Sequence, residues 1–169
     1  MFYKGTMESP IGPIQIIAED NYIIRVDFYQ GGFDDCNQFL AKTFGEIQYA
    51  AGLNPEVLKT IVQLDEYFSG QRKSFDINVK LYGTEFYTRV WKNLCDIPYG
   101  KTISYKMLAE RCGTPKGFRA VGQANHHNPI SIVVPCHRVI GADKKLTGYG
   151  SGLNVKQFLL QIEQSHKEQ

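Results

Sequence analysis

The chain has 169 residues, of which 43% are hydrophobic and 21% are charged, and its formal net charge is +2. This composition is typical of a soluble globular protein, and the length allows one domain or two small ones. No apolar stretch approaches the roughly 20 residues that span a bilayer, and the first ten residues lack the pattern of a secretory signal, so we expect a cytoplasmic protein that binds no membrane.

The four cysteines are scattered, without a CxxC pair or a Cys/His cluster of zinc-ligand spacing. They predict neither a disulfide framework nor a metal site. The charges are divided unevenly, because residues 1–80 carry 7 Lys/Arg against 11 Asp/Glu, whereas residues 81–169 carry 12 against 6. The basic second half suits a partner with a phosphate backbone.

The first 80 residues predict an α/β domain, a small antiparallel sheet with a helix. Three strand-like runs form a meander, with turns at Ser9-Pro10 and Asp20-Asn21: residues 2–7, 11–20 and 22–29. A short helix follows around residues 34–44. A longer helix begins after the N-cap Asn54 with Pro55 at its first position, and it ends at Gly70.

Residues 81–169 predict a mostly α domain that contains a helix-turn-helix. Helical spacing of apolar residues begins at Thr84, and Ser104 caps the next helix, which stops at Gly113. A second helix is expected at once, with Thr114 as its cap and Pro115 at its first position. This pattern is typical of DNA-binding proteins, although helix pairs with short turns are also common in plain α structure.

The second helix of this pair has two different sides. Its inner side is expected to carry Phe118, Val121 and Ala124, and its outer side Lys116, Arg119, Gln123 and His126. Ala120 and Gly122 have so little side-chain bulk that a duplex could approach the helix backbone closely. The alternative is a solvated polar face.

The stretch "NPISIVVPCHRVIG" places a cysteine after an apolar run. It predicts a turn at Asn128-Pro129 and a strand that Pro135 ends, with Cys136 at its mouth. A lone cysteine is most often a buried hydrophobe, but a cationic or hydrogen-bonding neighbourhood favours the thiolate. His137 needs a turn or a bridging water to act on the sulfur, and a third group to hold its tautomer. Glu163, in a predicted helix over residues 154–164, is a candidate.

Residues 84–163 closely resemble the O6-alkylguanine-DNA alkyltransferases. The resemblance runs through "IPYGKTISY", "RAVGQAN", "NPISIVVPCHRVIG", "TGYGSGLNVK" and "LLQIE", in the order and at the spacing of the family. It implies a winged-helix-like C-terminal domain after a ribonuclease-H-like N-terminal one, and it covers the first third of the chain only in outline.

The resemblance also implies what the residues do. A duplex-DNA repair protein of this kind flips out an O6-alkylguanine and moves the alkyl group onto Cys136, once per molecule, without a cofactor and as a monomer. His137 would act through a water and be oriented by Glu163, while Asn128 would brace the turn. Arg119 would fill the gap in the base stack. Further residues would rotate the nucleotide or line the base pocket: Tyr105, Val139, Tyr149, Gly150 and Ser151.

Two other classes of function remain open from the residues. A Cys/His hydrolase would need an oxyanion hole and a histidine that meets the sulfur directly. A pure binding module would be a helix-turn-helix regulator or an alkyltransferase-like damage sensor. The presence of Cys136 argues against the sensor, and no dimerisation helix is evident for the regulator.

Overall fold

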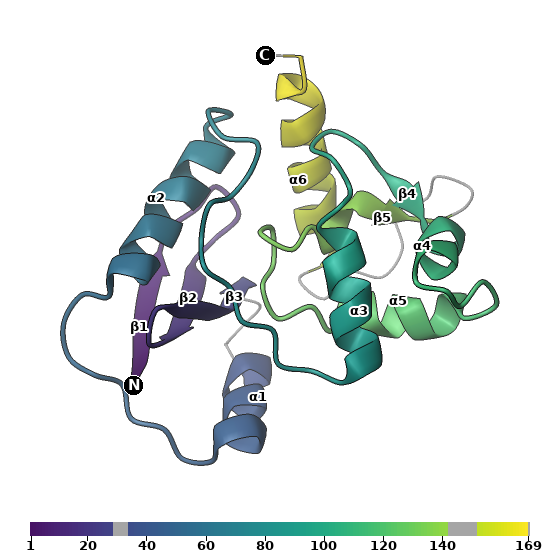
Figure 1. Cartoon of the computed structure of the whole chain (residues 1–169). Coiled ribbons are helices and arrows are strands. Elements are labelled where there is room, and N and C mark those ends of the chain that lie inside the picture. The colour runs from purple at the N-terminus through teal and green to yellow at the C-terminus, as the bar shows by residue number, and fades with distance from the viewer. Residues whose placement is uncertain (29–33, 142–151, 169) are drawn as a thin grey trace. The chain divides into compact units, whose positions relative to one another are not determined.

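The computed structural model describes residues 1–28, 34–141 and 152–168 (Figure 1). The chain forms two compact units, Met1–Tyr82 with Pro129–Ser131, and Gly83–Asn128 with Ile132–Gln169. Pro129–Ser131 thus belong to the first unit, whereas the sequence suggested a single division of the chain at residue 80. Within the described ranges, no helix has the length and apolar character needed to cross a membrane.

The first unit is built on a three-stranded antiparallel sheet. Its strands β1 (Phe2–Met7), β2 (Ile14–Glu19) and β3 (Tyr22–Phe28) pair in chain order, which confirms the predicted meander. The central strand is almost wholly buried, and its Ile14 pairs with Met7 on one side and with Phe28 on the other.

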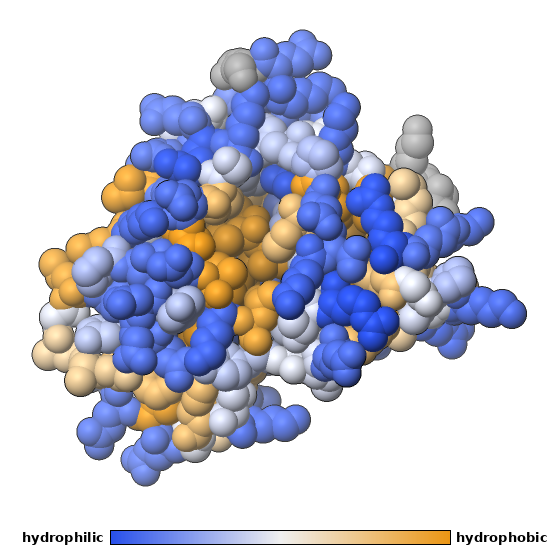
Figure 2. Space-filling model, in the orientation of Figure 1, coloured by the Kyte–Doolittle hydropathy of each residue, from blue (hydrophilic) through white to orange (hydrophobic). Residues whose placement is uncertain are grey.

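Two helices accompany this sheet, α1 (Asp34–Phe44) and α2 (Pro55–Phe68). The helix α2 begins as its sequence predicts, because Asn54 Oδ1 accepts hydrogen bonds of 3.0 Å from the backbone N–H groups of Glu56 and Val57. It packs on the sheet through buried residues that include Val57 and Leu64. Its outer side keeps some apolar residues exposed, and Figure 2 shows hydrophobic surface among the hydrophilic atoms of this helix.

The second unit is mostly helical. It contains α3 (Glu85–Leu94), β4 (Ile103–Ser104), α4 (Tyr105–Arg111), α5 (Phe118–His126), a 3-10 turn (Cys136–Arg138), β5 (Val139–Ile140) and α6 (Leu153–His166). The predicted caps Thr84 and Ser104 accept from the backbone N–H groups of Tyr87 and Met107. The helices α4 and α5 form the helix-turn-helix, and the parallel pair of β4 and β5 lies beside α4.

The second helix of the motif begins later than its sequence suggests. It starts at Phe118 after Gly117, so the prediction of Thr114 as N-cap was wrong. The Thr114 carbonyl accepts from the Gly117 N–H at 2.7 Å, which closes a separate turn before α5. Gly113, at φ +75°, lets the chain leave α4 in that direction. Phe118, the first residue of α5, is 54% exposed, so the prediction that it lies on the inner side was wrong.

The predicted strand after Pro129 is not formed. Only Ile130 and Ser131 pair with a strand, since Ile130 bridges to Val26 of β3 and the Ser131 N–H donates to the Val26 carbonyl at 3.1 Å. The chain then turns at Ile132, whose φ of +70° lies in the left-handed region. Ile130 and Val134 are both buried, but Ile130 belongs to the first unit and Val134 to the second. The apolar run therefore does not indicate one continuous strand.

Candidate active site

Cys136 opens the 3-10 turn and is almost completely buried. Its backbone N–H donates to the Val134 carbonyl at 2.9 Å. Two asparagines hold the carbonyls on either side of this N–H, since Asn128 Nδ2 donates to Val134 O at 2.7 Å and Asn125 Nδ2 donates to Cys136 O at 3.2 Å. Asn128 is thus hydrogen-bonded to the chain just before Cys136, and the contact of Asn125 was not anticipated from the sequence.

The structure brings the predicted pair His137 and Glu163 together. His137 Nε2 lies 2.5 Å from Glu163 Oε2, and both side chains are shielded from solvent. The short turn at Cys136–Arg138 directs the imidazole towards α6, where Glu163 lies on the buried side. Within the described part of the chain, His137 Nδ1 is buried without a hydrogen-bond partner. This nitrogen is the atom to which a water between His137 and the thiol of Cys136 would donate a hydrogen bond.

Arg138 points to the carboxylate and not to the sulfur in the contacts that the structure describes. Its Nε donates to Glu163 Oε1 at 2.8 Å and its Nη2 to Glu163 Oε2 at 3.2 Å, while Nη1 donates to the carbonyl of Ile97 at 2.7 Å. The Gly100 N–H adds a further hydrogen bond to Glu163. This guanidinium therefore fixes the carboxylate that holds His137.

These contacts set the charges of the pair. Burial opposes the ionisation of Glu163, but the hydrogen bonds of His137 and Arg138 outweigh it and lower the pKa of Glu163 to about 2. Burial lowers the pKa of His137, against the opposing effect of Glu163. The imidazole is thus neutral, with its proton on Nε2 towards the carboxylate, and Nδ1 can accept a proton.

Lys156 is a buried charged residue that sequence reasoning missed. Its Nζ donates to the Val139 carbonyl at 2.5 Å and lies 5.8 Å from the centre of the Tyr105 ring. Burial lowers the pKa of Lys156 to about 8, against an opposing effect of the charge of Cys136. Lys156 and Glu163 are seven residues apart and share the buried stripe of α6. Charged residues on an apolar stripe were the available signal.

The residues predicted to touch DNA lie at or near α5. Lys116 precedes the helix in the turn, and the outer positions are exposed: Lys116, Arg119, Ala120 and Gln123. Gly122 is half-buried, and a Cβ built on it would lie 3.9 Å from the ring of Tyr105. Val139 is buried in β5. Tyr149, Gly150 and Ser151 lie outside the described residues.

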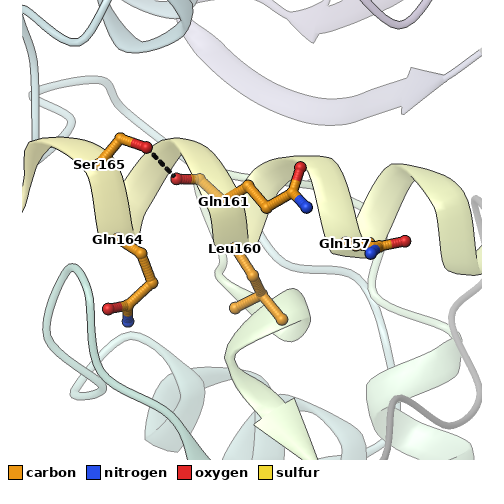
Figure 3. Close-up of a pocket in the computed structure, with 5 residues that line it drawn as sticks. All are labelled: Gln157, Leu160, Gln161, Gln164 and Ser165. Carbon is orange, nitrogen blue, oxygen red and sulfur yellow. Dashed lines mark hydrogen bonds between the residues drawn. The ribbon is translucent and has the colours of Figure 1, made fainter.

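A surface pocket along α6 is a different feature. Figure 3 shows that its lining residues project from this one helix: Gln157, Leu160, Gln161, Gln164 and Ser165. None of these side chains ionises at neutral pH, and Lys156 and Glu163 are buried on another side of α6. The arrangement that can support nucleophilic chemistry is therefore the one around Cys136.

Known proteins match both units of the chain. Residues 2–81 match the family described as "6-O-methylguanine DNA methyltransferase, ribonuclease-like domain", and residues 85–165 match its "DNA binding domain". A curated relative from Methanosarcina mazei, named methylated-DNA--protein-cysteine methyltransferase, is 57% identical, with 97% of this chain and 98% of that protein covered.

Solved structures agree with these matches. The crystal structure of Mycobacterium tuberculosis O6-methylguanine methyltransferase is 40% identical with a TM-score of 0.85, and the match covers 98% of this chain and 94% of that one. The crystal structure of M. tuberculosis OGT in complex with DNA is 39% identical with a TM-score of 0.82, over 98% and 93% of the two chains. Matched over both units, this chain belongs to the 6-O-methylguanine DNA methyltransferase family.

Proposed function

We propose that this protein repairs duplex DNA by moving the alkyl group of an O6-alkylguanine onto Sγ of Cys136, once per molecule. The observation that carries this proposal is the buried pair behind the cysteine. A neutral His137, held by the ionised Glu163, presents Nδ1 as a proton acceptor next to the residue that has to lose a proton. Membership of the family provides the reaction in which such a thiolate is used.

The atoms of the reaction balance without a cofactor. The thiol proton passes through a water to His137 Nδ1, and the thiolate attacks the alkyl carbon. An S–C bond forms while the bond between that carbon and guanine O6 breaks, and the leaving base takes up the proton that His137 returns through water, which leaves the imidazole neutral again. The product is a thioether, which water does not cleave. O4-alkylthymine presents the same kind of alkyl ether and is a second candidate substrate.

We infer that the exposed side of α5 binds the duplex and that the damaged nucleotide is flipped towards Cys136. Arg119 projects from an exposed position on the first turn of α5, where it can replace the lost base in the stack. We infer that Tyr105, whose ring lies near Gly122 and Lys156, contacts the base. Since one acceptor cysteine and one helix-turn-helix suffice for one lesion, we propose that the protein acts as a monomer. We also propose that it acts in the cytoplasm.

Peptide mass spectrometry after incubation with a duplex that contains O6-methylguanine tests this function. We expect one methyl mass on the peptide that bears Cys136 and restored guanine in the DNA. Cys136→Ser should abolish both, while the matched control Cys36→Ser should retain both. An unmodified Cys136 peptide with an intact lesion contradicts the proposal, and repeated turnover of an ester or amide would instead favour a hydrolase.

A test of the role of Arg119 requires a second substrate, the free alkylated base. Arg119→Ala should slow repair in duplex DNA by about 10-fold or more, because flipping costs a few kcal/mol of stacking that nothing then replaces. Its reaction with the free alkylated base should change little. Equal losses on the duplex and on the free base would show that Arg119 has no part in flipping.

A further inference from the structure

Asn125 occupies an unusual position for a polar residue, because it lies in the last turn of α5 and is 2% exposed. Its amide reaches across 11 residues of sequence to the carbonyl of Cys136, at 3.2 Å. A carbonyl accepts hydrogen bonds only, so this contact fixes the NH₂ group towards Cys136 and directs the other end of the amide, Oδ1, elsewhere.

That oxygen lacks a partner. Within the described residues, Asn125 Oδ1 is buried and makes no hydrogen bond, and the same is true of His137 Nδ1. A buried acceptor without a donor costs about 1–3 kcal/mol, so such atoms normally mark a place where a water binds. Both atoms belong to residues that adjoin Cys136, the first through its hydrogen bond to the Cys136 carbonyl and the second through the peptide chain.

The two acceptors require the same kind of partner. His137 donates from Nε2 to Glu163, which leaves Nδ1 as an acceptor, and Asn125 Oδ1 is an acceptor in every state. One water has two hydrogens for these two atoms and an oxygen that can accept the thiol proton of Cys136. This gives the water about three hydrogen bonds, the usual number for a buried water.

We propose that Asn125 is a positioning residue, whose Oδ1 accepts a hydrogen bond from the water that carries the proton from Cys136 Sγ to His137 Nδ1. This inference rests on the proposed function, since it deepens the step that forms the thiolate. The proton leaves sulfur for the water while the water gives a proton to Nδ1. Asn125 neither gains nor loses a proton, and it holds the second hydrogen of the water throughout.

The experiment measures the thiol without DNA. Alkylation of Cys136 by iodoacetamide is followed by peptide mass spectrometry from pH 5 to 10, which separates it from the exposed Cys95. The ionisable side chains that the structure describes around Cys136 stay in place: His137, Arg138, Tyr105 on α4, and Lys156 and Glu163 on α6.

Asn125→Leu keeps the size of the side chain and removes both polar ends. We expect alkylation at pH 7 to slow by about 5- to 10-fold, the value of one hydrogen bond of about 1–1.4 kcal/mol, and the deficit to shrink as the pH rises, because hydroxide can then take the thiol proton in place of His137. The matched control is Trp91→Phe, which removes a buried 2.7 Å hydrogen bond to the neighbouring Ala124 carbonyl. It should lower stability without moving the pH profile.

A pH profile of Asn125→Leu that superimposes on that of the parent overturns the proposal. If this variant does not fold, a crystal structure of the parent at high resolution decides, because the proposal requires an ordered water within hydrogen-bond distance of Asn125 Oδ1, His137 Nδ1 and Cys136 Sγ. A donor other than water on Asn125 Oδ1 rejects it. Failure of methyl transfer from DNA with a normal iodoacetamide profile would instead reject the proposed function.

Discussion

Cys36 in the first unit and Cys136 in the second are both almost completely buried beside an arginine and a carboxylate. At Cys36 burial is the largest effect on the thiol and the carboxylate of Asp27 the next, and together they raise the pKa of Cys36 to about 12 against the opposing effect of Arg25. At Cys136 the carboxylate contacts His137 and Arg138 instead, and the buried cation of Lys156 interacts with the sulfur.

The comparison teaches that burial and a nearby ion pair do not make a thiol reactive. At Cys36 the guanidinium of Arg25 also acts on the sulfur but does not offset burial and the carboxylate, so the balance of charges around the sulfur decides. A carboxylate opposes the thiolate, whereas a neutral imidazole with an accepting nitrogen can remove its proton. The two cysteines can therefore be tested against each other within one chain.

The largest effect should come from Glu163→Gln, which leaves Arg138 buried opposite an uncharged partner. We expect a loss of about 3–5 kcal/mol in the free energy of unfolding and a transfer rate lower by about 10²-fold, from denaturant titration and single-turnover kinetics. The pKa of Glu163 is lowered from 4.5 to about 2, so the stability that it adds is complete above pH 4.5 and is lost as the pH falls towards 2. If the variant repairs DNA at the parental rate, Glu163 has no role in the mechanism.

Lys156→Met should change how stability depends on alkaline pH. The pKa of Lys156 falls from 10.5 to about 8 on burial, so between these values the unfolded chain binds more protons and the free energy of unfolding rises with pH. Replacing Lys156 should reduce this rise by about 1–3 kcal/mol. Urea titrations of parent and variant at pH 8 and 10.5 measure it, and parallel pH dependences would show that Lys156 is charged alike in both states.

Asp27→Asn tests the other cysteine. Removing the negative charge should lower the pKa of the Cys36 thiol below its value of about 12, although burial should keep it above the ordinary value of 9. The β-carbon chemical shift of Cys36, followed by NMR through a pH titration, reports this change. An unaltered titration would mean that burial alone holds Cys36 neutral, and the contrast with Cys136 would then lose its electrostatic basis.

The smallest effect should come from Gln15→Met, which removes the 3.6 Å contact from Gln15 Nε2 to the sulfur of Cys36. Sulfur is a weak acceptor and Met fills a similar volume, so the free energy of unfolding should change by less than about 1 kcal/mol. Thermal unfolding of parent and variant measures the difference. A clearly larger loss would show that Gln15 positions the Cys36 thiol.

The sequence predicted the class of the fold through local chemistry, and the pair of His137 and Glu163 through the resemblance to a family. Asn54 and Ser104 were recognisable as caps because their side chains act within three residues. The comparisons confirm the predicted family and its activity as a methylated-DNA–protein-cysteine methyltransferase. The roles given to individual site residues stay predictions, supported by where the structure places them.

What could not be predicted depends on contacts between distant segments. The N-cap at Thr114 failed because its carbonyl closes a turn with Gly117 before the helix begins. Asn125 and Lys156 were missed because each donates to a backbone carbonyl, that of Cys136 or of Val139, and the residue type does not reveal which carbonyl a fold brings near. Periodicity finds the buried side of a helix but not the reason why a polar residue is on it.

The pairing of residues 129–131 with β3 affects how this protein can be divided. Val26 donates to the Pro129 carbonyl at 3.0 Å and accepts from the Ser131 N–H at 3.1 Å. A fragment that starts at residue 83 would keep the turn Cys136–Arg138 but leave these peptide groups and the apolar Ile130 without their partners in β3. Such a truncation exposes unpaired peptide groups and apolar surface five residues before Cys136, so residues 83–169 are not an independent module in the linear chain.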